Sequence, residues 1–349
     1  QVCWLVVLPP AAVMGCCSSK AGAAEKYATL RNVRGEDMLA EYTLQDELGI
    51  GAYSVVYGAQ GHKEEVAIKI IRMQQPGPDK ARLKLERAES VYQTLQQTPD
   101  NFQLDLAKKE LKRLRHQLRA ATKQLDEVEV ESEIKMLRLL GESGDRTVKL
   151  LDVYQDSRHV ALVMQRCSHT LQAAPRYDGK CTLQLRSSFE DAARSVQHLH
   201  TLDVIHRDIK PENFLVTGEG AVILGDFGLA AELDGCEFVR GRAGTSDYSA
   251  PEVLLDSRQG KECDVWSLGA VLFFLVAGGV HLSKVIEFEA LLESADPLTA
   301  LNTEVVRAVE DACRRCPDPE LLPLVLGMLT PTFQRRLRIQ ECVQHQWLA

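Results

Sequence analysis

The stretch "HRDIKPEN", His206–Asn213, decides which fold we expect from this sequence. Asp208 and Asn213 are five residues apart, and Lys210 lies between them. A carboxylate that can accept a hydroxyl proton therefore shares one loop with an amide oxygen that can bind a metal ion. The stretch "DFG", Asp226–Gly228, follows and supplies a second hard oxygen ligand. Mg²⁺ bound to phosphates takes one or two protein oxygens of this kind.

Two earlier stretches complete this set. "GIGAYSVV", Gly49–Val56, lies between two predicted strands, and glycines at such a turn let backbone amides approach phosphate oxygens. "VAIK" ends at Lys69 and closes an apolar strand pattern. Each of the two is common by itself. In this order, and together with "HRDIKPEN" and "DFG", they form a specific set of motifs.

The four stretches resemble the motif set of the eukaryotic protein kinase family. The resemblance runs from Tyr42 to Leu348 and includes "APE" (Ala250–Glu252) and "DVWSLG" (Asp264–Gly269). It implies an α+β, two-lobed protein kinase fold. We expect a small β-rich N-lobe at 42–165, a large and mainly α-helical C-lobe at 166–348, and a cleft between them.

The resemblance implies ATP and Mg²⁺ as cofactors. Lys69 would hold the α- and β-phosphates and pair with Glu133, the best placed glutamate on the helix after the third strand. The residues that would surround the nucleotide are Gly49, Gly51, Ser54, Val56, Ala67, Lys69, Met164, Gln165 and Cys167. Met164 would be the gatekeeper of the hinge "MQRCSHTL", which lacks the acidic residue that relatives often offer to the ribose.

The same resemblance assigns the catalytic chemistry to the two central loops. Asp208 would orient and deprotonate the acceptor hydroxyl, and Lys210 would steady the γ-phosphate. Asn213 and Asp226 would hold Mg²⁺.

Further residues would hold the catalytic loop, His206–Asn213, and the activation segment, which runs from "DFG" to "APE" (Asp226–Glu252). Glu252 and Arg338 would form a buried ion pair, and Asp264 would hold the catalytic loop through its backbone amides. Thr245 would contact the catalytic loop. Gly241 occupies the place where many relatives carry a phosphorylated threonine. We therefore expect activity without phosphorylation of the activation loop.

Lys210 and "GTSDYSAPE", Gly244–Glu252, resemble serine/threonine kinases, which act on protein substrates. "PENFLV" and "RIQECVQHQWL" are similar to the calcium/calmodulin-dependent group, and "MGCC" followed by "PENF" to plant and protist calcium-dependent protein kinases. No EF-hand loop pattern occurs in the sequence, which therefore gives no support for calcium control. The alternative is a pseudokinase or ATP-binding scaffold whose helical insert and lipid anchor recruit partners.

A charged insert at about 73–128 separates Lys69 from Glu133. Leu104, Leu111, Leu118 and Leu125 recur every seven residues, which predicts an amphipathic helix with a coiled-coil seam. The insert would form an intramolecular helical hairpin or dimerise. From Leu104 to Lys123 there are seven Lys/Arg against two Asp/Glu, so attraction to an anionic membrane surface is the competing interpretation. We favour the hairpin or dimer.

The stretch "MGCCSSK", Met14–Lys20, matches a signal for N-terminal acylation. If Met14 is the initiator, residues 1–13 are upstream sequence and Gly15 carries myristate. One such chain binds membranes only marginally, and palmitoylation of Cys16 and Cys17 would supply the second signal. Residues 14–41 would then be an acylation motif and flexible linker, and the protein would lie in the cytoplasm on the cytosolic face of a membrane.

Composition is consistent with this interpretation. The hydrophobic share of 45% and the charged share of 26% are those of a globular protein. The net charge of −8 argues against general nucleic-acid binding. Ten unevenly spaced cysteines indicate thiols rather than a disulfide framework. "CRRC", Cys313–Cys316, has the spacing of a metal or redox site, but no second pair lies nearby, so we assign both cysteines to a helix surface and core.

Overall fold

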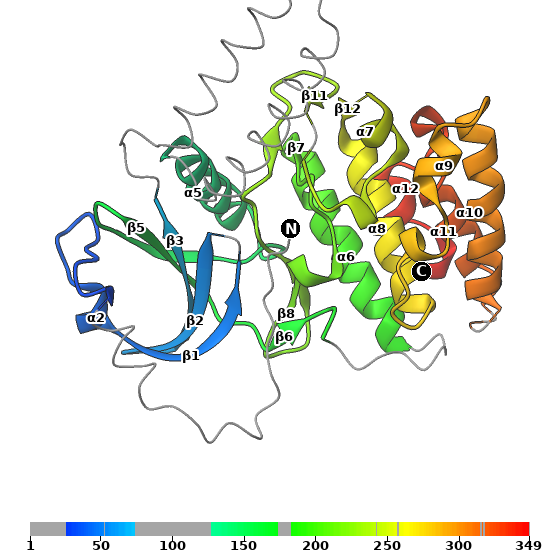
Figure 1. The fold of residues 1–349 in the computed structure, drawn as a ribbon. Helices are drawn as coiled ribbons and strands as arrows, with labels where there is room; N and C mark the ends of the chain where they lie inside the picture. The colour runs from blue at the N-terminus through cyan, green and yellow to red at the C-terminus, as the bar shows by residue number, and fades with distance from the viewer. Residues whose placement is uncertain are drawn as a thin grey trace, which may run out of the picture.

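The computed structural model describes residues 26–51, 53–73, 127–173, 183–241, 243–256, 258–314, 316 and 318–348. These residues form a β-rich lobe followed by a mainly helical lobe (Figure 1). The predicted α+β, two-lobed fold is therefore confirmed. The predictions for the acylation motif and for the heptads of the insert concern residues outside the described part of the chain.

The N-lobe is built on one antiparallel sheet of five strands in the order β1-β2-β3-β5-β4. Its strands are β1 (Tyr42–Ile50), β2 (Ser54–Gly61), β3 (Glu65–Arg72), β4 (Leu150–Gln155) and β5 (His159–Gln165). The pairs β1–β2, β2–β3 and β4–β5 are antiparallel, and β3 lies beside β5, so these two buried strands lie in the interior of the sheet. Helix α5 (Glu127–Glu142) packs beside the sheet, as Figure 1 shows.

The C-lobe is organised around helix α8 (Lys261–Val276), the helix that contains "DVWSLG". Thirteen of its residues are buried, which explains why this apolar stretch has no polar face. The other helices are α6 (Leu183–Thr201), α7 (Pro251–Asp256), α9 (Phe288–Leu292), α10 (Pro297–Cys313), α11 (Leu321–Met328) and α12 (Ile339–Val343). Among the described residues, no helix combines the length and apolarity that crossing a bilayer requires.

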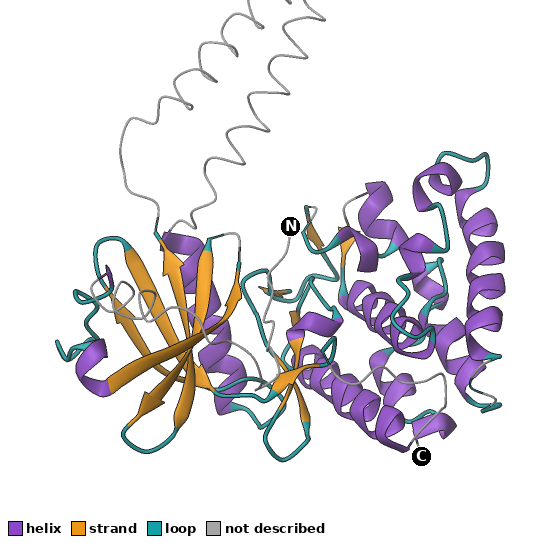
Figure 2. Ribbon diagram, turned by 60° about the horizontal axis from the view of Figure 1, so that its bottom comes forward, coloured by secondary structure: helices purple, strands orange, loops and turns teal. Residues whose placement is uncertain are grey.

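Short strands outside the main sheet flank the loops that carry the sequence motifs (Figure 2). Strands β6 (His169–Thr170), β8 (Phe214–Val216) and β9 (Val222–Leu224) form one sheet. Strand β7 (Val204–Ile205) pairs with β10 (Ala231–Glu232), and β11 (Val239–Arg240) pairs with β12 (Arg258–Gln259). The catalytic loop lies between β7 and β8, and the "DFG" stretch lies between β9 and β10. Paired backbone therefore flanks each of these loops on both sides.

Residues 26–41 correct one prediction, because they are not a flexible linker. Tyr27, Leu30 and Met38 are almost fully buried in the apolar cluster on the outer side of the sheet. Arg31 exchanges two backbone hydrogen bonds with Gln155 at the end of β4, with N···O distances of 3.1 and 2.7 Å. Helix α2 (Met38–Glu41) then leads into β1. The segment looks polar in sequence because only every few residues face the sheet.

The two cysteines of "CRRC" lie at the C-terminal end of α10. Cys313 and Cys316 are both buried in the C-lobe core. Within the described part of the chain, no group of three or more His, Cys, Asp or Glu residues is placed to hold a metal ion. The predicted core position fits the structure. The predicted helix-surface position does not, because both side chains are buried.

Candidate active site

Lys69 of β3 and Glu133 of α5 form an ion pair between the sheet and the helix. Lys69 lies in β3, opposite Val56 of β2, and its side chain is buried. Its Nζ lies 2.6 Å from Oε1 of Glu133 and 3.0 Å from Oδ1 of Asp226. Burial raises the pKa of Glu133, and the Lys69 ammonium opposes that shift. The chain thus places a cation between two carboxylates at the inner edge of the N-lobe.

The position of Glu133 follows from the apolar pattern of α5. Val130, Leu137 and Leu140 are buried in the core, and Glu133 lies on the same face. A charged residue on such a face is tolerated only when a partner neutralises it. Lys69 is that partner, so the helix can dock only in an orientation that forms the pair.

The catalytic loop brings Asp208, Lys210 and Asn213 together. Lys210 Nζ lies 2.6 Å from Asp208 Oδ2, and Asn213 Nδ2 donates to the Asp208 carbonyl oxygen at 2.8 Å. Burial lowers the pKa of Lys210, but the Asp208 carboxylate and its hydrogen bond outweigh burial and raise it overall. Lys210 is therefore charged at neutral pH. The other carboxylate oxygen of Asp208 is held by Thr245.

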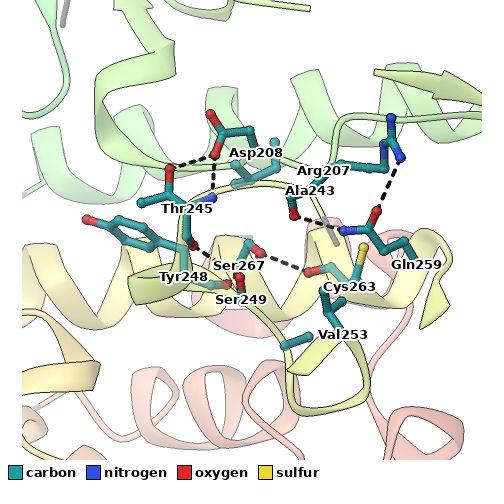
Figure 3. A pocket seen from close by; sticks show the side chains of 12 residues that line it. Arg207, Asp208, Ala243, Thr245, Tyr248, Ser249, Val253, Gln259, Cys263 and Ser267 are labelled. Atoms are coloured by element: carbon teal, nitrogen blue, oxygen red, sulfur yellow. Dashed lines mark hydrogen bonds between the residues drawn. The ribbon is translucent and has the colours of Figure 1, made fainter. Parts of the chain in front are cut away.

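Thr245 links the activation segment to the catalytic loop, as expected (Figure 3). Its backbone N–H and its hydroxyl both donate to Asp208 Oδ1, at 2.8 and 2.7 Å. Lys210 Nζ donates in turn to the Thr245 hydroxyl at 3.1 Å. Since these three groups form a closed set of bonds, the orientation of the Asp208 carboxylate depends on the position of the activation segment.

Asp264 at the start of α8 holds the other side of the catalytic loop. It accepts hydrogen bonds from the backbone N–H groups of His206 and Arg207, at 2.8 and 2.9 Å. A third contact, 3.0 Å long, comes from His200 Nε2. Burial tends to raise the pKa of Asp264, but the contacts with His200 and His206 outweigh burial and lower it.

His200 was not predicted from the sequence. It lies near the end of α6, and its partner is 64 residues away. One signal was available. His200 occupies the same helix face as Val196 and Leu199, which are fully buried, so a polar partner is needed there.

The ion pair of Glu252 corrects a second prediction, because its partner is Arg336 and not Arg338. Arg336 Nη1 and Nη2 contact the two Glu252 carboxylate oxygens at 2.6 and 2.9 Å. Arg338 is exposed, and its backbone N–H donates to Glu341 at the start of α12. The sequence "RRLR" offers three arginines within four positions. Their spacing alone does not reveal which one faces inward.

The candidate nucleotide-binding residues lie on the inner strands and the connection between the lobes. Gly51 N–H donates to the Ser54 carbonyl oxygen at 2.7 Å, which closes the glycine turn between β1 and β2. Val56 and Ala67 pack with Leu48 in a small apolar cluster, and Gly49 pairs with Val56.

The hinge side of this surface is formed by β5 and the residues that follow it. Met164 is buried and pairs with Ala67 on β3. Gln165 ends β5 and Cys167 follows it, half-buried, where burial raises the pKa of its thiol to about 11. A thiol with this pKa is neutral at physiological pH. Cys167 therefore contributes a neutral side chain to the hinge, next to the charged Arg166.

The chemistry of Asn213 and Asp226 fits a magnesium ion bound together with phosphates. Asn213 uses its NH₂ group on the catalytic-loop backbone, which directs its carbonyl oxygen to other partners. Asp226 has a left-handed backbone with φ of 60°, and its side chain remains partly exposed beside Lys69. Two hard oxygen donors and a nearby lysine are what a phosphate-bound Mg²⁺ requires.

The sequence profile described as "Protein kinase domain" matches residues 103–348. Curated relatives are similar as well. "Serine/threonine-protein kinase PEPKR2" of Arabidopsis thaliana is 32% identical over 225 residues, covering 63% of this chain and 45% of the relative. "CBL-interacting protein kinase 22" of Oryza sativa subsp. japonica is 34% identical over 236 residues, covering 63% and 49%.

A third relative matches along nearly the whole sequence. "Calcium-dependent protein kinase 20" of Oryza sativa subsp. japonica is 29% identical over 342 residues, covering 95% of this chain and 51% of the relative. The chain thus spans about half the length of these plant relatives.

Proposed function

Because the chain belongs to the protein kinase family, we propose that it transfers the γ-phosphate of ATP to serine or threonine hydroxyls of protein substrates. The names of the plant relatives support the serine/threonine class. The arrangement of Lys69, Asp208, Asn213 and Asp226 supports catalysis over a scaffold function.

The residues divide the work of phosphoryl transfer between them. Bound ATP supplies the phosphoryl group, and Mg²⁺ neutralises the charge on its phosphates. Lys69 holds the α- and β-phosphates, and the 2.6 Å contact with Glu133 keeps its ammonium in place. Asn213 and Asp226 provide the protein oxygens for the metal.

Asp208 acts on the acceptor hydroxyl. Its Oδ1 accepts from Thr245 and its Oδ2 from Lys210, so the carboxylate is fixed before a substrate arrives. A fixed carboxylate orients the hydroxyl and accepts its proton as the bond to phosphorus forms. Lys210, whose Nζ lies 2.6 Å from Asp208 Oδ2, would steady the charge on the transferred phosphoryl group.

One observation carries the proposal: the Lys69–Glu133 ion pair is formed while Asp226 lies 3.0 Å from Lys69. A protein kinase requires both the lysine–glutamate pair and the "DFG" aspartate in place for catalysis. A chain that served only as a scaffold would have no need to keep this arrangement.

Transfer of radiolabel from ATP to a mixture of serine and threonine peptides tests the proposal. We expect transfer by the native protein and a loss of at least about 100-fold in the Asp208→Asn variant. Asp311→Asn, an exposed position on α10, is the matched control and should retain full activity. Equal labelling by native protein and Asp208→Asn would favour the pseudokinase alternative.

We also propose that the protein is anchored on the cytosolic face of a membrane through Gly15, Cys16 and Cys17. The support is the sequence "MGCCSSK". Expression from Met14 should give a membrane-bound protein, and Gly15→Ala should release it into the soluble fraction. Retention of the Gly15→Ala variant on membranes would contradict the proposal.

A further inference from the structure

We propose that Gln259 is a positioning residue that ties the activation segment to the catalytic loop and replaces the phosphate group that orders this segment in many kinases. The inference rests on the proposed kinase activity and adds a regulatory consequence. The activation segment of this protein is held in place by a neutral side chain that is present from the moment of folding.

The side chain of Gln259 bridges two elements that are distant in sequence. Its Oε1 accepts a hydrogen bond from Arg207 Nη1 at 3.3 Å, and its Nε2 donates to the Ala243 carbonyl oxygen at 3.0 Å (Figure 3). Arg207 belongs to the catalytic loop, and Ala243 to the activation segment. A single amide thus links both.

The backbone around Gln259 fixes the bridge. Gln259 lies in β12 and pairs with Val239 of β11, so the strand holds its main chain against the activation segment itself. The side chain is only 1% exposed. The cavity beside it has a volume of about 10 Å³, which is room for a single water. Both hydrogen bonds of the Gln259 side chain therefore form away from bulk solvent.

Arg207 is held in the orientation that the bridge needs. Its φ is 66°, a left-handed conformation that is uncommon outside glycine, and its Nε donates to the Leu229 carbonyl oxygen at 2.6 Å. Its guanidinium thus donates to two neutral oxygens, one from Leu229 and one from Gln259. A neutral amide occupies the place at which a phosphate would bring negative charge.

The bridge acts directly on the catalytic geometry. Gly244, which follows Ala243, has φ of 99°, and a Cβ there would lie 2.2 Å from the Arg207 carbonyl oxygen. The activation segment can approach Arg207 this closely only with glycine at this position. The next residue is Thr245, which holds the Asp208 carboxylate. A displacement at Ala243 would therefore reach Asp208 within two residues.

The sequence explains why such a device is needed. Activation loops of many kinases become ordered when a phosphorylated residue pairs with an arginine. Here Gly241 has no hydroxyl that could be phosphorylated. Gln259 supplies an acceptor to Arg207 without that modification. The amide also donates to Ala243, which a phosphate dianion cannot do.

The test compares Gln259→Met, which keeps the length of the side chain and removes both hydrogen bonds, with Gln259→Glu, which keeps the acceptor for Arg207. Gln340→Met, an exposed glutamine of α12, is the matched control. All proteins are treated with phosphatase, and intact mass verifies that they carry no phosphate. The measurements are kcat and KM for a peptide substrate and for ATP, and amide hydrogen exchange in residues 243–249.

We expect Gln259→Met to lower kcat about tenfold or more and to accelerate exchange of the Thr245 amide by a similar factor, since loss of one or two buried hydrogen bonds has this effect. KM for ATP should stay within about twofold, because Gln259 lies away from Lys69 and the hinge. Gln259→Glu keeps the acceptor for Arg207 but loses the donor to Ala243, so its kcat should lie between those of Gln259→Met and the native protein, which loss of packing alone would not predict. Gln340→Met should match the native protein.

Native kcat and native exchange in Gln259→Met would overturn the proposal. So would loss of activity of the native protein on phosphatase treatment. If the native protein transferred no phosphate at all, the proposed function would fail, and amide exchange alone would test the Gln259 bridge. Equal exchange in the native protein and Gln259→Met would then exclude the bridge. Faster exchange in Gln259→Met would uphold it.

Discussion

Replacement of Arg336 by methionine should destabilise the C-lobe strongly, and the same change at Arg338 should not. The side chain of Arg336 is fully buried, and its guanidinium lies over the Trp266 ring at 5.1 Å. Besides Glu252, it donates to the carbonyl oxygens of Glu262, Thr330 and Pro331. Arg336 therefore joins α7, α8 and the loop before α12.

The size of the effect follows from what the variant leaves behind. Arg336→Met removes the partner of a Glu252 carboxylate that is itself 7% exposed. An uncompensated buried charge of this kind costs about 3–5 kcal/mol, and the orphaned carbonyl oxygens add to it. Large domains lose roughly 2–4 °C in Tm per kcal/mol, so we expect a fall on the order of 10 °C. Arg338→Met, at an exposed position, should cost less than about 0.5 kcal/mol.

Thermal unfolding followed by tryptophan fluorescence measures both variants under identical conditions. The double variant Glu252→Gln/Arg336→Met should lose less than the sum of the two single variants, because the charge that Arg336→Met strands is then absent. A native Tm in Arg336→Met would refute the assignment. An equal loss in Arg338→Met would show that the arginine identified from its contacts is the wrong one.

Three further predictions concern other parts of the fold. Tyr27→Ala should cost about 3–5 kcal/mol in the free energy of unfolding, whereas Val33→Ala, at a residue 93% exposed, should change it little; chemical denaturation checks both, and equal values would restore the linker interpretation. Asp264→Asn weakens the charge-assisted hydrogen bonds from the backbone N–H groups of His206 and Arg207, so it should destabilise the protein by about 1–3 kcal/mol at pH 7. The pKa of Asp264 in the folded protein lies below its ordinary value of 3.8. The difference in free energy of unfolding between the native protein and Asp264→Asn should therefore be fully present above pH 3.8 and vanish as the pH falls through the folded pKa. A difference that persisted at lower pH would contradict this. Glu133→Gln should lower kcat/KM for a peptide substrate roughly 10–100-fold. Glu131→Gln, on the exposed side of α5, should match the native enzyme in the same assay. A native rate in Glu133→Gln would show that catalysis does not depend on the Lys69–Glu133 ion pair.

Most of the catalytic contacts could be predicted because their residues lie in short motifs with fixed backbone geometry. Asp208, Lys210 and Asn213 belong to one loop of eight residues, so their mutual distances are largely local. The kinase resemblance implied that Lys69 pairs with a glutamate on the helix after the third strand. The apolar pattern of α5 then identified Glu133 as that glutamate.

The errors have a different physical origin. Which of Arg336 and Arg338 faces inward depends on how the loop after α11 turns, and that turn is set by tertiary contacts with α8. Hydrophobic spacing was no guide, because Leu337 lies between them. Segment 26–41 was misassigned since burial of a short irregular segment leaves no periodic pattern.

Gln259 and His200 illustrate a further limit. Each makes its decisive contact with a residue more than fifty positions away. Neither has a side chain that sequence reasoning associates with a motif. Their importance comes from burial together with unsatisfied hydrogen-bonding groups opposite them, and both are properties of the packed structure.

The attachment of residues 26–41 also determines how mechanical force would enter the protein. Tension on the chain ahead of residue 26 would act first on Tyr27, whose ring contacts Tyr57 of β2 and His159. It would act next on Arg31, which is bonded to Gln155 at the end of β4. Only after both had yielded would the load reach β1 and its glycine turn. A tethered molecule could therefore be pulled or reoriented while the turn between β1 and β2 kept its shape.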